Sequence, residues 1–166
     1  GRILDQNEKT AKYINSPETI IYHKRDLLYG LSQTKSFVRK KNKIIVVEGE
    51  LDVISSYQAG AKNVAAIKGS ALTEAQVNLI KRFVPTVILA LDVDSAGDTA
   101  ARRGIEIADK AGLNIKIVQP KYGKDPDECA RHSALMWRES ISKAIPIFDF
   151  YLKSARSRFD QKSAEG

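Results

Sequence analysis

Short apolar runs alternate with amphipathic segments along most of the chain. The runs at 44–47, 64–67 and 87–91 are apolar throughout and have the length of strands that are buried on both faces, and 115–118 predicts a fourth strand. The amphipathic segments have helical spacing and cover 51–59, 73–84 and 95–112. Strands and helices that alternate in this way predict right-handed β-α-β units and therefore a parallel sheet.

The chain outside this region has a different texture. A helical pattern over 26–41 ends in a basic run, Lys35 to Lys43, which is either a solvated helix end or a nucleic-acid contact. After Pro120 the pattern is loop and helix. Because the sequence begins at Gly1 and ends in a polar run, we expect both ends to be cuts within a longer protein.

Charge narrows the range of partners. Lys and Arg number 27 and Asp and Glu 20, which gives a net charge of +7. A basic domain favours polyanions through phosphate contacts, although the surface could also be basic without a specific partner. Cys129 is the single cysteine, so an internal disulfide and a cysteine-based zinc cluster are excluded. No run suits a membrane span or a secretory signal, so we expect a cytoplasmic protein.

Carboxylates follow three of the four predicted strands. The first strand is followed by Glu48 and Asp52, the third by Asp92 and Asp94, and a loop after the fourth carries a further pair, Asp125 and Asp127. Gly49 is expected to let the backbone turn sharply beside Glu48. Ligands of open α/β sheets bind at the carboxyl ends of the strands, so these side chains are expected to converge.

Converging carboxylates repel one another, and a divalent cation removes that penalty. Oxygen ligands without nearby histidine or cysteine favour Mg²⁺ or Mn²⁺ over zinc. Each acidic cluster alone is also typical of a turn or a helix start. The three clusters together, in this order, are more specific.

Several segments resemble the bacterial DnaG-type DNA primases. Residues 46–53 resemble the glutamate motif of TOPRIM domains, 91–100 their Asp-x-Asp motif in its primase form, and 123–128 the acidic segment of the primases. Residues 12–19, 23–31 and 67–73 also match the family. The resemblance covers about residues 1–150.

The resemblance implies a TOPRIM-type, Rossmann-like parallel sheet flanked by helices, with parts of two further subdomains. Residues 1–42 would end the N-terminal subdomain of the primase core, 43–124 would form the TOPRIM domain, and 125–166 would hold the acidic segment and the start of a C-terminal helical subdomain.

The resemblance also implies an activity, the metal-dependent synthesis of RNA primers from NTPs on single-stranded DNA, as by a DNA-directed RNA polymerase in replication. Residues 1–166 alone are expected to be weakly active or inactive. The implied partners are the template, NTPs, the RNA primer and, through a region outside this chain, the replicative helicase of the primosome. No membrane partner is expected, and the location would be the cytoplasm, at the nucleoid.

By the same resemblance, specific residues acquire roles. Glu48, Asp92 and Asp94 would be catalytic and would form the metal site with Asp125 and Asp127, while Asp52 would orient them. The residues expected to contact nucleotide or nucleic acid are Lys12, Lys24, Lys68 and Arg103.

Two positions depart from the family pattern. Glu50 stands where the family usually has an aromatic residue, and Lys68 where it usually has an apolar or small one. Both follow strands at the carboxyl edge, so one hypothesis is that they form a compensating ion pair near the nucleotide site. The alternative is two independent solvated charges.

Three other functions stay open from the sequence. Another TOPRIM enzyme, a topoisomerase or nuclease, is one, although the upstream segment 15–19 argues against it. A haloacid dehalogenase-type phosphatase also uses Asp-x-Asp, but after its first strand. The third is a nucleotide- or nucleic-acid-binding module without turnover.

Overall fold

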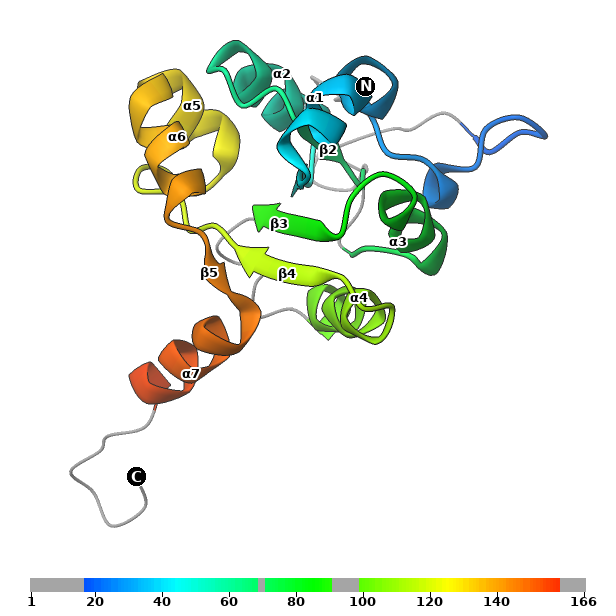
Figure 1. Ribbon diagram of the computed structural model, residues 1–166. Coiled ribbons are helices and arrows are strands. Elements are labelled where there is room, and N and C mark those ends of the chain that lie inside the picture. Colours follow the sequence, from blue (N-terminus) through cyan, green and yellow to red (C-terminus); the bar gives the residue numbers. More distant parts are fainter. Residues whose placement is uncertain (1–16, 69–70, 91–98, 159–166) are drawn as a thin grey trace, which may run out of the picture.

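Residues 17–68, 71–90 and 99–158 are described by a computed structural model, in which helices flank both faces of a five-stranded sheet (Figure 1). The strands are β1 (Ile44–Val47), β2 (Val64–Ala66), β3 (Thr86–Ala90), β4 (Asn114–Ile117) and β5 (Ile145–Pro146). The helices are α1 (Leu31–Lys41), α2 (Glu50–Gln58), α3 (Glu74–Lys81), α4 (Thr99–Lys110), α5 (Pro126–His132), α6 (Ala134–Ser142) and α7 (Ile147–Arg158), with a 3₁₀ turn η1 (Lys24–Asp26) before them.

The sheet confirms the predicted α/β fold and corrects it at one edge. Its strand order is β2-β1-β3-β4-β5, and the first four strands are parallel. β5, which was not predicted, runs antiparallel to β4 with Pro146 opposite Lys116. A strand of two residues is too short to show a pattern, and a proline without an N–H group suits an edge position.

Strands β1, β2 and β3 form because both of their faces are covered, whereas β4 exposes Asn114 and Lys116 on one face. Ile44 and Val46 of β1 face a core shared with α1, α3 and α4, whereas Ile45 and Val47 face a second core shared with α2, α5 and α6. All four side chains of β1 are at most 1% exposed. Two covered faces explain why the sequence shows continuous apolar runs and no alternation.

α3 begins with a capping box. Thr73 Oγ1 accepts a hydrogen bond from the Gln76 N–H at 3.2 Å, and Thr73 N–H donates to Gln76 Oε1 at 3.1 Å. The amide of Gln76 is buried and also donates to the carbonyl oxygen of Leu27 at 2.9 Å. The cap therefore fixes the upstream segment as well as the helix.

The helix predicted over 26–41 begins later, at Leu31. Tyr29 is held in extended backbone because it exchanges two hydrogen bonds with Ala66 of β2, at 2.9 and 3.0 Å. Gly30 then adopts a φ of +82°, a conformation that favours glycine, and α1 starts after it. The pairing with β2 thus delays the helix.

Close packing against a neighbouring loop defines the position of α4. A Cβ atom added to Gly104 would lie 2.7 Å from the backbone nitrogen of Leu72, so α4 can approach this loop only with glycine there. The helix ends at Lys110, two residues before the end of the predicted range 95–112. Residues 95–98 of the helix predicted over 95–112 lie outside the described residues.

The last three helices take different positions. α5 and α6 pack on α2, and α7 extends away from the sheet (Figure 1).

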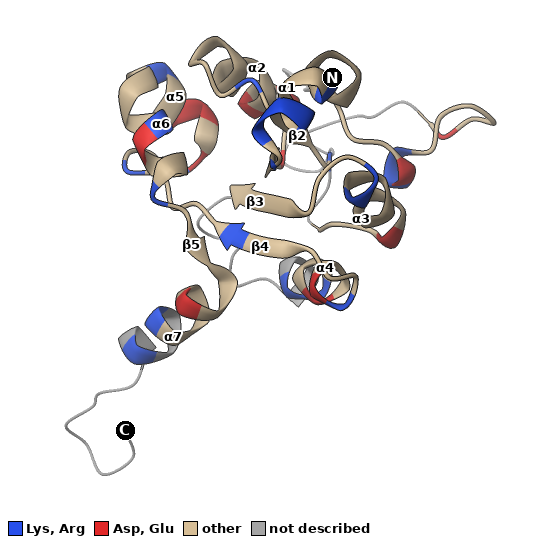
Figure 2. Ribbon diagram, in the orientation of Figure 1, with Lys and Arg blue, Asp and Glu red and all other residues tan. Residues whose placement is uncertain are grey.

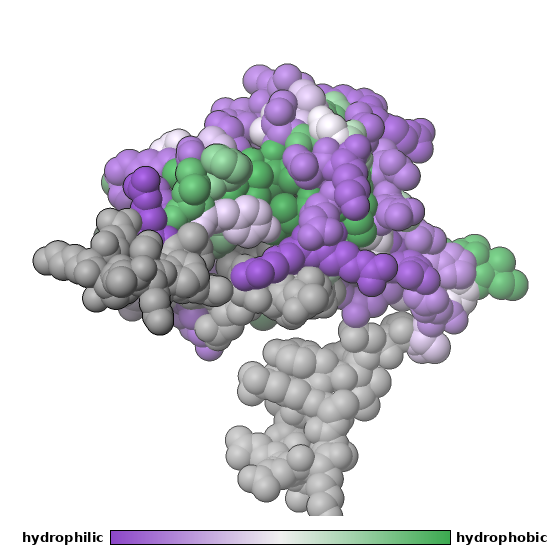
Figure 3. Space-filling model, turned by 90° about the horizontal axis from the view of Figure 1, so that it is seen from below, coloured by the Kyte–Doolittle hydropathy of each residue, from purple (hydrophilic) through white to green (hydrophobic). Residues whose placement is uncertain are grey.

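An exposed apolar turn lies near the start of the described chain. It is formed by residues 19–22 and projects at the right of Figures 1 and 3; its residues Ile20 and Ile21 are 96% and 92% exposed. No helix in the described ranges is long and apolar enough to span a bilayer.

Candidate metal and nucleic-acid site

Three adjacent strands deliver their following residues to one edge of the sheet. Val47 at the end of β1 lies between Ala66 of β2 and Ala90 of β3. Glu48 comes next after β1, and its carbonyl oxygen accepts a hydrogen bond from the Lys68 N–H at 3.0 Å. The Asp-x-Asp pair that follows β3, Asp92 and Asp94, lies outside the described residues.

Asp52 connects this edge to the third acidic cluster. One carboxylate oxygen accepts from the N–H of Gly49 at 2.9 Å, and the other accepts from the N–H of Asp127 at 3.1 Å. The side chain is 8% exposed. Asp52 thereby joins the first turn of α2 to the first turn of α5, which is the placement that an orienting residue needs.

Asp125 and Asp127 both have partners within the protein. Asp125 caps α5 by accepting from the Glu128 N–H at 2.7 Å, with Pro126 in the first turn. Asp127 pairs with Arg131 at 3.0 Å and accepts a short hydrogen bond from the Ser55 hydroxyl. The acidic segment therefore starts a helix and also faces Asp52.

Electrostatics show that these carboxylates share one region. Burial raises the pKa of Asp52 to about 6, and the negative charges of Asp125 and Asp127 add to the rise. The N–H groups of Gly49 and Asp127 lower the pKa in part. Mutual repulsion of this kind is what a bound divalent cation relieves, so the donor chemistry fits such an ion.

The complete ion site cannot be assembled from the described residues alone. Within 17–68, 71–90 and 99–158, no group of three or more acidic, histidine or cysteine side chains is arranged to hold a metal ion. Two of the five predicted ligands, Asp92 and Asp94, fall outside these ranges. The structure brings Asp52, Asp125 and Asp127 together next to the backbone of Gly49.

Glu50 and Lys68 form the predicted ion pair. Lys68 Nζ lies 2.8 Å from Glu50 Oε1, with side-chain exposures of 22% and 43%. The hydrogen bond that Lys68 donates to the Glu50 carboxylate raises the pKa of Lys68. Burial acts to raise the pKa of Glu50, but the hydrogen bond from Lys68, other hydrogen bonding and nearby positive charge together lower it. Both groups are therefore charged at neutral pH.

A groove of about 400 Å³ lies beside this pair, and we call it the basic groove. Its lining includes Tyr22, Lys24, Tyr29, Lys35, Lys68 and Phe83. Lys68 Nζ lies 3.4 Å from the Tyr22 hydroxyl oxygen and about 6 Å from the ring centroids of Tyr22 and Tyr29. Lysine with aromatic rings is a combination suited to single-stranded nucleic acid.

The other predicted nucleic-acid contacts lie elsewhere. Arg103 lines a separate groove between α3 and α4, where its neighbours include Glu74 and Glu106. It is not part of the basic groove. Lys12 lies outside the described residues.

Three residues of the site were not anticipated from the sequence. Ser55 is three residues after Asp52, a spacing that places both on one helix face and could have indicated a shared role. Tyr22 and Tyr29 had no such signal, because their proximity to Lys68 depends on the pairing of Tyr29 with Ala66.

A double-mutant cycle should detect coupling between Glu50 and Lys68. Lys68→Met is expected to raise Mn²⁺ affinity, because it leaves Glu50 uncompensated, and Glu50→Gln is expected to lower it. The double variant should differ from the sum of both by up to about 1 kcal/mol, the range for partly exposed pairs. Isothermal titration with Mn²⁺ gives the four affinities. Strictly additive effects would contradict a coupled pair.

The sheet with its acidic carboxyl edge defines a TOPRIM-class domain, and comparisons with known proteins agree. Residues 45–130 match the Toprim-like family, and residues 1–35 match the N-terminal domain of the DNA primase catalytic core. The chain belongs to the Toprim-like family and, within it, to the bacterial DnaG-type DNA primases.

Two curated relatives with similar sequences are DNA primases. The DNA primase of Clostridium acetobutylicum is 40% identical over 169 residues, which cover 99% of this chain and 27% of the relative. That of Aquifex aeolicus is 33% identical over 95% of this chain and 32% of the relative. The chain thus spans about a quarter to a third of the length of these curated relatives.

Solved structures support the fold. A DnaG primase catalytic domain bound to single-stranded DNA is 32% identical, with a TM-score of 0.78 over 100% of this chain and 53% of that one. The RNA polymerase domain of Mycobacterium tuberculosis primase DnaG, in complex with double-stranded DNA, is 28% identical, with a TM-score of 0.83 over 99% of this chain and 54% of that one.

Proposed function

We propose that this chain carries the metal-binding centre of a primase, which synthesises RNA primers from NTPs on single-stranded DNA. The observation that carries the proposal is that Asp52 joins the start of α2, just after Glu48, to Asp127 at the start of α5, at the carboxyl edge of the sheet and beside the basic groove. The match of residues 1–35 to the primase core favours this function over a topoisomerase or nuclease.

Within this proposal, five carboxylates hold the ion: Glu48, Asp92, Asp94, Asp125 and Asp127. A bound Mg²⁺ or Mn²⁺ would neutralise triphosphate charge and favour attack by the primer 3′-hydroxyl. Through its two hydrogen bonds, Asp52 holds the start of α2 next to the start of α5. This contact keeps the distance between Glu48 and the acidic residues of α5 constant. Arg131 and Ser55 fix the carboxylate of Asp127.

The surrounding cations bind the nucleic acid. Lys24 and Lys68 belong to the basic groove next to the acidic edge, where they can contact template or nucleotide phosphates. Lys12 and Arg103 are further candidates by resemblance alone. The RNA primer and the replicative helicase, at the nucleoid, are proposed as partners of the whole primase. The helicase would bind through a region outside this chain.

The domain division is also part of the proposal. Residues 1–42 end the N-terminal subdomain, 43–124 form the TOPRIM domain, and 125–166 begin the helical subdomain. The described part of this last segment shares a core with the TOPRIM domain, since Cys129, Ala130 and Trp137 pack with Ile45 and Val53.

Titration with Mn²⁺ tests the metal centre directly. Asp92→Asn should weaken or abolish Mn²⁺ binding, because it removes a charged ligand from the acidic edge. Asp109→Asn, which removes the same charge from an exposed position on α4, is the matched control and should bind as the wild type does. Equal Mn²⁺ affinity in the wild type and Asp92→Asn would refute the metal assignment.

A further inference from the structure

The basic groove continues away from the acidic edge, between α1 and α3. Tyr29 is paired to the end of β2, and α1, which follows it, leads into the start of β1. α3 likewise leads from the carboxyl side of β2 to the start of β3. Both helices therefore run from the carboxyl edge of the sheet to its amino edge, and α1 is about 16 Å long at 1.5 Å per residue.

Positive charge follows the far part of this groove. Lys35 lines it, and Arg39 lies one helical turn further along α1. α1 contains no acidic residue, and none of the described residues that line the groove is acidic. Figure 2 shows Lys and Arg positions on α1 and at the end of α3, the two helices that border this groove.

Planar side chains lie at both ends of the basic groove. The guanidinium carbon of Arg39 lies 4.9 Å from the ring centroid of Phe83 at the far end. Tyr22 and Tyr29 lie beside Lys68 at the near end. Aromatic rings and guanidinium planes stack with bases, whereas an acidic peptide would use only the charge.

We propose that the far part of the basic groove binds a single nucleic-acid strand as it passes to or from the acidic edge. Lys35 and Arg39 contact its phosphates, and the Arg39–Phe83 pair provides a stacking surface for a base. The inference rests on the proposed function and deepens it by giving the template a path across the α1–α3 side, beyond the contacts predicted for Lys24 and Lys68.

Fluorescence anisotropy with a labelled oligothymidylate, measured against the salt concentration, tests the path. Lys35→Gln combined with Arg39→Gln should weaken binding and reduce the slope of log affinity against log salt by about 1.4, because each lost single-strand phosphate contact contributes about 0.7. Phe83→Leu should weaken binding about fivefold or more with an unchanged slope, because it removes stacking and keeps the charge.

A charge-matched control distinguishes a path from general attraction. Lys116→Gln combined with Lys143→Gln removes two exposed charges from β4 and the end of α6 and should leave the slope close to that of the wild type. Circular dichroism checks that each variant folds. All variants should retain Mn²⁺ binding. Titration with Mn²⁺ therefore distinguishes a damaged metal centre from a weakened binding of the oligonucleotide in the groove.

Three outcomes would overturn the inference. The control pair could lower the slope as much as the groove pair does, which would indicate general attraction. Phe83→Leu could leave affinity unchanged while polyglutamate competes as well as DNA does, which would indicate a site for acidic peptides. The wild type could also fail to bind the oligonucleotide.

Discussion

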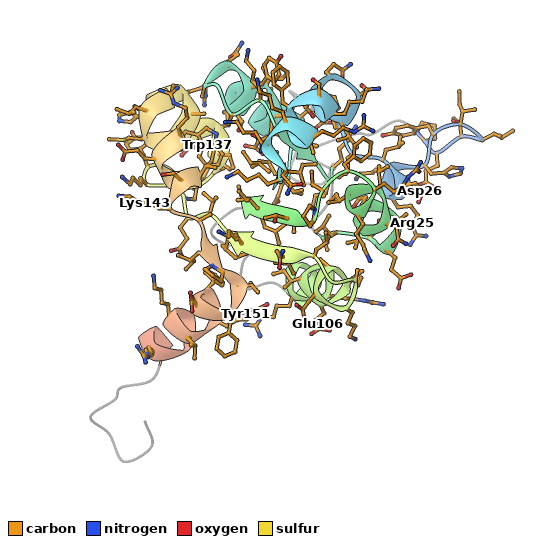
Figure 4. All side chains as sticks on the ribbon, in the orientation of Figure 1. Arg25, Asp26, Glu106, Trp137, Lys143 and Tyr151 are labelled. Atoms are coloured by element: carbon orange, nitrogen blue, oxygen red, sulfur yellow. The ribbon has the colours of Figure 1, made fainter. Side chains whose placement is uncertain are left out.

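Replacing Trp137 with alanine should lower the free energy of unfolding by about 3–5 kcal/mol, the range for deleting a buried aromatic side chain. Trp137 is 0% exposed and points from α6 into the interior (Figure 4). It packs in the core that α2, α5 and α6 share with one face of the sheet. The helix that carries Asp125 and Asp127 should therefore loosen as well.

Urea unfolding followed by far-ultraviolet circular dichroism measures this effect, because the variant lacks the chain's single tryptophan as a fluorescence probe. Met136→Ala is the matched control: its side chain lies next in sequence but is 39% exposed, so the expected change is within about 0.5 kcal/mol. An equal loss in both variants would show that α6 is not anchored through Trp137.

Elements that depend on local pattern were predictable from the sequence. Three buried strands are evident from continuous apolar runs, and the start of α3 from its capping residues, because each signal lies within a few neighbouring positions. The ion pair between Glu50 and Lys68 was also within reach, since parallel strands place their carboxyl ends side by side.

Features that depend on distant contacts were not predictable. Gly49 was expected to permit a sharp turn, but its φ of −111° is open to any residue. A Cβ atom there would instead lie 3.2 Å from the Asp52 carboxylate, so the glycine leaves space for that side chain. The late start of α1 similarly depends on the pairing of Tyr29 with Ala66.

The roles of exposed residues were the hardest to predict from the sequence. Arg103 was grouped with the nucleic-acid contacts by motif position, yet it lies beside Glu106, which also faces Tyr151 of α7 (Figure 4). A helix position fixes which side a residue occupies only when the packing of that helix is known.

Loss of the Glu48 carboxylate should reduce primer synthesis by at least about 100-fold, because Glu48 is the proposed ligand that leads directly from the central strand β1. The assay needs a longer primase that contains this chain, since residues 1–166 alone are expected to make little or no primer. Asp109→Asn in the same protein serves as the charge control and should prime normally.

The most direct test of the account is therefore RNA primer synthesis on single-stranded DNA, with NTPs and Mn²⁺, by the longer protein and its Glu48→Gln variant. The account predicts primers from the parent protein and from Asp109→Asn, and almost none from Glu48→Gln. Undiminished synthesis by Glu48→Gln would contradict the assignment of the acidic edge as the catalytic metal centre.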